Sequence, residues 1–76
     1  MSAITSGQIS LAINEILRGG AEAHVRIDGD TDGLNVLEAL AYTEHLVKLT
    51  VAGTDDIVIV PAARVIVIRG VPKPYR

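Results

Sequence analysis

The spacing of apolar residues changes at Gly19-Gly20, and this change limits the folds that the chain can adopt. Residues 5–18 place apolar side chains at the i, i+3, i+4, i+7 and i+8 positions of an amphipathic helix: Ile9, Ala12, Ile13, Ile16 and Leu17. Thr5 and Gln8 have the spacing of a capping box, and the two glycines are a helix stop. We therefore expect one N-terminal helix that covers one side or one mouth of a sheet.

After the glycines the apolar period becomes two. Ala23, Val25 and Ile27 alternate with polar residues, which predicts a half-buried strand. Two β-branched runs near the other end, 57–60 and 65–68, are separated by a short turn that begins at Pro61. Because these runs are almost continuously apolar, we expect strands covered on both faces, or strands with one face covered by a neighbouring subunit.

Residues 34–51 allow two interpretations. Four residues have helical spacing, and leucine and alanine are good helix formers: Leu34, Leu37, Leu40 and Ala41. Four residues alternate as they would in a strand, with Glu38 as the exception: Leu34, Val36, Leu40 and Tyr42. Residues 46–51 form a further β-rich run. We favour two strands broken near Thr43-Glu44, with a helix over 34–42 as the alternative.

These elements predict an α+β fold in which an N-terminal amphipathic helix precedes about five strands. Short connections favour a small, mostly antiparallel β-barrel or a strongly bent sheet. Residues 1–70 form the single predicted domain, since a chain of 76 residues has room for one core. Residues 71–76, which include Pro72 and Pro74, form a predicted extended tail.

The small size of the chain points to self-association. A domain this small buries only about 60% of the surface that its unfolded chain exposes, and without cysteine it has no disulfides to compensate. Yet 49% of the residues are hydrophobic and only 21% are charged. Another subunit would cover the surplus apolar surface. The predicted interface residues lie in the last two strands: Ile57, Ile59, Val65, Ile66 and Val67.

Charge and hydropathy argue against two classes of partner. A formal net charge of −2 disfavours a broad basic face for polyphosphate binding. No apolar run is long enough to span a membrane, so no membrane partner is predicted. We expect a cytoplasmic protein, or one that lies within a virion or another assembly.

The order of one helix, five strands and a terminal strand pair split by a short turn resembles the Sm-like fold in its bacterial Hfq form. Residues 56–68 resemble the last two strands of that family, and residues 42–49 are similar to the aromatic-acidic segment of its first motif. The resemblance implies a six- or seven-membered ring that binds RNA.

Three cations are candidates for binding a ligand or RNA phosphate. Arg64 and Arg69 flank the last predicted strand, and Lys73 follows it. A ring would repeat them around a rim and so build an electropositive track from an acidic subunit. The alternative is that they form ordinary surface and interface salt bridges.

Alternate aspartates form the other distinctive motif. Asp28, Asp30 and Asp32 precede Gly33 as ligands do at the start of a calcium loop. The twelfth position of such a loop is Ala39, and the nearest carboxylate, Glu38, lies one place too early. We favour a solvated hairpin turn rich in Asp-Gly. No cofactor is therefore predicted, and calcium held by Asp28, Asp30, Asp32 and Glu38 remains the alternative.

The two histidines, His24 and His45, also allow two interpretations. With Glu22 or Glu44 each histidine could form a metal or acid–base site. We favour exposed positions on the polar faces of strands. Glu44 and His45 are adjacent, so on a strand they would point to opposite faces.

No catalytic motif is present. The sequence has no recognisable Ser-His-Asp set, phosphate-binding glycine loop or nucleotide fingerprint, so we predict that the chain is not an enzyme. The favoured function is a homo-oligomeric, ring-forming binding or assembly module. The alternatives are an Sm-like ring that binds RNA or a nucleotide-like ligand, and a structural subunit of a virion or shell.

Overall fold

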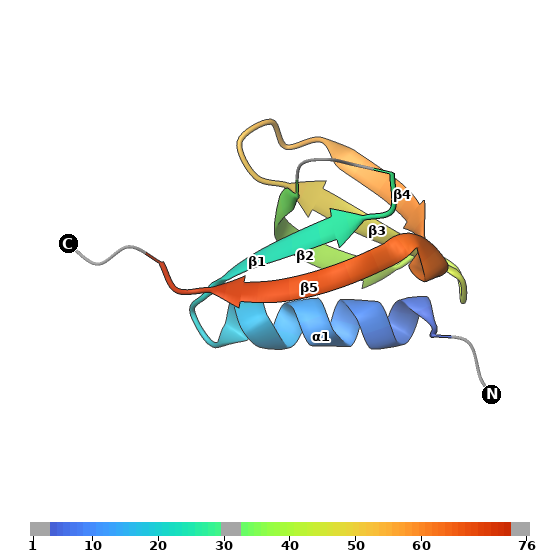
Figure 1. Cartoon of the computed structure of the whole chain (residues 1–76), viewed down its shortest axis with the longest axis horizontal. Coiled ribbons are helices and arrows are strands. Elements are labelled where there is room, and N and C mark those ends of the chain that lie inside the picture. Colours follow the sequence, from blue (N-terminus) through green and yellow to red (C-terminus); the bar gives the residue numbers. More distant parts are fainter. Residues whose placement is uncertain (1–3, 30–32, 74–76) are drawn as a thin grey trace.

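The computed structural model describes residues 4–29 and 33–73. One helix precedes five strands (Figure 1): α1 (Ser6–Arg18), β1 (Glu22–Ile27), β2 (Leu34–Ala41), β3 (Leu46–Val51), β4 (Ile57–Pro61) and β5 (Val65–Val71). A short 3-10 helix, η1 (Ala62–Arg64), connects β4 to β5. β5 ends one residue beyond the predicted domain boundary at residue 70, and Pro72 and Lys73 follow it without regular structure.

Helix α1 confirms the N-terminal prediction. The backbone N–H of Gln8 donates to Thr5 Oγ1 over 3.2 Å, and the backbone N–H of Thr5 donates to Gln8 Oε1 over 2.8 Å. This reciprocal pair satisfies donors that a helix start leaves without partners. Gly19 caps the other end. At 13 residues, α1 is too short to cross a membrane, and the described part of the chain contains no helix that could do so.

The five strands form one antiparallel sheet in the order β4-β3-β2-β1-β5. The predicted pair of strands over 34–51 is confirmed, with the break at residues 42–45, and the helical alternative for 34–42 is wrong. Figure 1 shows α1 lying along one side of this sheet. The prediction that the helix covers the sheet is therefore confirmed.

A β-bulge in β2 overturns one detail of the predicted pattern. The register of β2 on β3 shifts between Val36 and Glu38, which leaves Leu37 as an extra residue. As a result Val36 and Ala39 are both buried, although they are three residues apart. The prediction that Leu40 and Tyr42 share the buried face with Val36 is wrong, since both are exposed.

The sheet is open, so the α+β class is confirmed and a closed barrel does not form. β4 and β5 are the two edges of the sheet and do not pair with each other. The core forms on the face that α1 covers. Its buried apolar side chains come from α1, from η1 and from four of the strands: Ile9, Ile13, Ala23, Val25, Ile27, Val36, Ala39, Val47, Leu49, Val60 and Ala62.

Hydrogen bonds connect the start of α1, the β2–β3 connection and the β4–β5 connection at one end of the molecule. The buried Ser6 hydroxyl donates to the Thr43 carbonyl, and the Ser6 N–H donates to the Glu44 carbonyl over 2.9 Å. The Ala62 N–H donates to the His45 carbonyl over 2.8 Å. These bonds fix the start of α1, the β2–β3 connection and the β4–β5 connection relative to one another.

The capping box predicts a modest stability effect. Replacing Thr5 by alanine leaves the Gln8 N–H without its side-chain acceptor, so we expect a loss of about 1 kcal/mol in the free energy of unfolding. Urea denaturation followed by circular dichroism measures this loss. Ser10→Ala is the matched control, because its exposed hydroxyl donates only to the Gly7 carbonyl within the helix. A Thr5→Ala variant as stable as Ser10→Ala would contradict the capping argument.

Candidate functional site

The two edge strands expose apolar side chains. On β4, Ile57 is 60% exposed and Ile59 is 44% exposed; on β5, Ile66 is 56% exposed and Val67 is 37% exposed. The expectation that both faces of these strands are covered is therefore wrong for the isolated chain. The alternative, in which a neighbouring subunit covers one face, stays a prediction.

Neither edge carries strong protection against pairing with another strand. Proteins commonly protect an edge strand with lysine or with an inward-pointing charge. β4 has no charged residue, and its only protective residue is Pro61 at its last position. β5 has one charged residue, Arg69. The packing within one subunit leaves the apolar side chains of these two edges uncovered.

The three predicted phosphate-binding cations do not gather at one point. Arg64 lies just before β5, Arg69 lies within it and Lys73 lies beyond its end. A strand of seven residues is roughly 20 Å long, so Arg64 and Lys73 lie near opposite ends of the sheet edge. Arg69 lines a pocket together with Arg26 and His24.

That pocket lies on the polar face of β1 and β5. It has a volume of about 300 Å³ and is lined by His24, Val25, Arg26, Gly33, Val67 and Arg69. His24 lies directly opposite Arg69 in the β1–β5 pairing, and Arg26 lies opposite Val67. The sequence analysis did not include His24 and Arg26 among the phosphate-binding candidates. His24 and Arg26 are two residues apart, so they share one face of a strand. The pairing of β1 with β5, however, has no signal in the local sequence.

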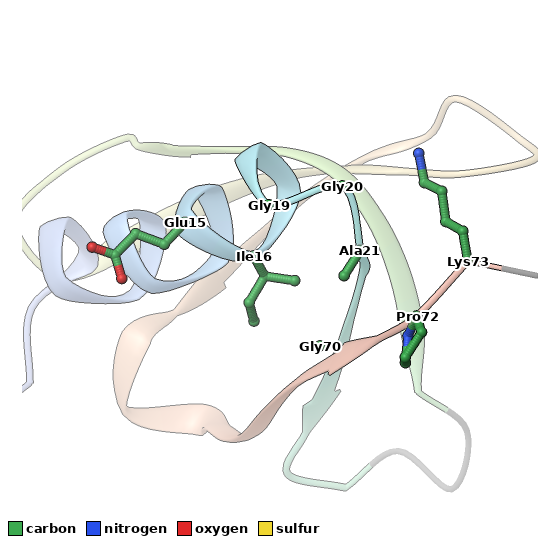
Figure 2. Close-up of a pocket in the computed structure, with 8 residues that line it drawn as sticks. All are labelled: Glu15, Ile16, Gly19, Gly20, Ala21, Gly70, Pro72 and Lys73. Carbon is green, nitrogen blue, oxygen red and sulfur yellow. The ribbon is translucent and has the colours of Figure 1, made fainter.

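A larger cavity lies where the C-terminal end of α1 meets β5 (Figure 2). It is an open groove of about 780 Å³, lined by Glu15, Ile16, Gly19, Gly20, Ala21, Gly70, Pro72 and Lys73. Figure 2 shows Ile16 pointing toward Gly70, whereas the charged ends of Glu15 and Lys73 point away from each other. A Cβ atom on Gly70 would lie 3.2 Å from Ile16 Cγ2, so the glycine permits close packing of the helix on β5. The groove therefore reflects helix–sheet packing, and the lining residues that the structure describes bring no polar groups together.

Each histidine lies beside the glutamate that the sequence analysis named. His24 Nε2 lies 3.1 Å from Glu22 Oε1, and His45 Nε2 lies 3.9 Å from Glu44 Oε1. Residues 42–45 form a bend instead of a strand, so the alternation of faces along a strand does not apply to Glu44 and His45. Residues 4–29 and 33–73 contain no cluster of three or more metal-ligating side chains.

The predicted calcium motif lies partly outside the described residues, since Asp30 and Asp32 are not among them. Asp28 lies in the turn after β1, where its N–H donates to the Arg64 carbonyl over 2.7 Å. Glu38 lies within β2, roughly 13 Å along the strand from Leu34. The structure therefore does not bring Glu38 into the turn that contains Asp28.

Comparison of the chain with protein-family models, curated proteins and solved structures gives no significant match.

Proposed function

We propose that this chain is a non-enzymatic, homo-oligomeric assembly module whose subunits join through the β4 edge of one copy and the β5 edge of the next. The observation that carries the proposal is the exposure of isoleucine on both edges of an open sheet, at Ile57, Ile59 and Ile66. Pairing with another strand would satisfy the edge backbone and remove these side chains from water.

The position of the two edges favours a ring over a simple dimer. β4 and β5 lie at opposite ends of the strand order, so a single type of β4–β5 contact, repeated from subunit to subunit, covers both edges of every copy. A two-fold dimer through one edge would leave the other edge exposed. A repeated head-to-tail contact closes into a ring when its rotation divides a full turn, and otherwise extends as a filament.

The resemblance to the Sm-like family supports the same arrangement, since it implies a closed ring. The helix, the five strands and the short connection between β4 and β5 are the features on which that resemblance rests. A virion or shell subunit would use the same edges but would assemble further as the concentration rises. We propose the closed ring as the functional form and a cytoplasmic or assembly-associated location for it.

Native mass spectrometry of the purified protein near neutral pH, without refolding, tests the proposal. We expect one closed oligomer of fixed subunit number over a wide range of protein concentration. A monomer at all concentrations would contradict the proposal. A series of growing masses would favour the shell subunit.

A second candidate function, the binding of RNA or a nucleotide-like ligand by the ring, rests on Arg64, Arg69 and Lys73. Repetition around a ring would place one copy of each cation on every subunit rim. If RNA binds, charge reversal at Arg64 and Arg69 should weaken the binding of short RNAs and make the remaining binding less dependent on salt concentration. Unchanged RNA binding by the doubly reversed variant would contradict this second function.

A further inference from the structure

We propose that His24, Arg26 and Arg69 form a binding pocket for a phosphate group on the outer face of β1 and β5. The pocket is built within one subunit, so this proposal does not depend on ring assembly. Its ligand would be a small phosphate monoester or inorganic phosphate, because both present the same compact, strongly charged group.

The strand register brings the three side chains to one place. His24 and Arg26 are two residues apart on β1 and therefore share a face of the sheet. Arg69 on β5 pairs directly with His24 and is the diagonal neighbour of Arg26. Direct cross-strand pairs have Cβ atoms about 5 Å apart, and diagonal pairs are separated by roughly 7 to 8 Å. Two arginine side chains at that diagonal separation can both reach one phosphate placed between them.

The electrostatics of the pocket favour an anion. The lining residues that the structure describes include two arginines and a histidine and no carboxylate. Among the described residues, neither Arg26 nor Arg69 lies within ion-pair distance of a carboxylate, and Glu22 lies against His24. A bound phosphate would supply the opposite charge that neither arginine has beside it among the described residues.

The dimensions and chemistry of the pocket define the ligand class. A volume of about 300 Å³ accommodates a phosphate with a small organic group attached. Arginine binds phosphate through paired N–H donors, and such charge-assisted hydrogen bonds are among the strongest in proteins. Val67, which is 37% exposed, supplies an apolar part of the wall, against which a non-polar portion of the ligand can pack.

The test is a titration of the full chain with inorganic phosphate, with adenosine monophosphate and with adenosine, at constant ionic strength maintained by chloride. NMR signals of the His24 ring and the arginine side chains report the binding. We expect both phosphate-containing probes to shift the signals of His24, Arg26 and Arg69. Tighter binding of the monophosphate than of inorganic phosphate would identify a phosphate monoester as the ligand, and equal binding would identify free phosphate.

Arg69→Gln is the main test variant, and Arg18→Gln is its control because it removes the same charge from α1, outside the pocket. Loss of a charge-assisted contact is expected to weaken phosphate binding by about tenfold or more, whereas the control should stay within about twofold. Since Arg69 lies on an edge strand, Arg26→Gln on the interior strand β1 repeats the test away from the edge. The proposal is overturned if chloride alone produces the same signal shifts, if adenosine binds as well as its monophosphate, or if Arg26→Gln and Arg18→Gln weaken binding equally.

Discussion

Replacing Ile59 by aspartate is expected to convert the assembled protein into folded monomers. Ile59 is 44% exposed in the single subunit, so water can solvate an aspartate there. In a β4–β5 contact between copies, the same carboxylate would be buried without a partner, at a cost of several kcal/mol. A penalty of only about 3 kcal/mol weakens each contact by more than a hundredfold. Native mass spectrometry measures the subunit number, and circular dichroism confirms the fold.

Leu11→Asp is the matched control for this prediction. Leu11 is 57% exposed on α1, away from both edges, and receives the same new charge. We expect this variant to keep the subunit number of the unmodified protein. If Ile59→Asp remains fully assembled, or if Leu11→Asp dissociates as readily, the β4 edge is not the interface.

A mixture of two edge variants tests the head-to-tail arrangement directly. Ile59→Asp blocks the β4 edge, and Ile66→Asp blocks the β5 edge, so each variant retains one intact edge. Only one unmodified β4–β5 contact can then form. It joins the intact β4 of the Ile66→Asp variant to the intact β5 of the Ile59→Asp variant. We expect each variant alone to be monomeric and the mixture to give mixed dimers and nothing larger. Dimers of either variant by itself would instead indicate a two-fold contact.

Local patterns predicted most of the secondary structure because each element has its own signal in the sequence. The capping box at Thr5 and Gln8 and the glycines after Arg18 define a helix with the observed bounds to within one residue. The runs at 57–60 and 65–68 favour strands, because they are β-branched and lie on either side of Pro61. These signals act over a few residues, so no knowledge of the tertiary structure was needed.

The errors have a common physical origin in the pairing between strands. Periodicity assumes one continuous register, whereas the extra residue Leu37 shifts the phase of β2, so Ala39 takes the buried position in place of Leu40. The cationic pocket was missed for a related reason. His24 and Arg69 are far apart in the sequence, and only the placement of β5 beside β1 brings them together.

Truncation of Leu49 to alanine is expected to produce a large loss of stability. Leu49 is fully buried on the interior strand β3, which lies between β2 and β4. A buried leucine-to-alanine change typically costs about 2 to 5 kcal/mol, because the lost side chain leaves a cavity. A domain of this length has roughly 4 to 11 kcal/mol of stability in total. We therefore expect the variant to unfold at a much lower urea concentration, or to be partly unfolded in buffer.

Leu40→Ala separates the effect of burial from the effect of losing leucine. Leu40 lies on the neighbouring strand β2 and is 47% exposed, so its truncation should change the free energy of unfolding by about 0.5 kcal/mol or less. Urea titrations at one fixed protein concentration compare the two variants, since assembly adds stability that depends on concentration. Equal losses from both truncations would show that Leu49 does not lie in a packed core. A large loss at Leu49 alone would establish the face of the sheet beneath α1 as the core, and would leave the opposite face and the two edges free for binding and assembly.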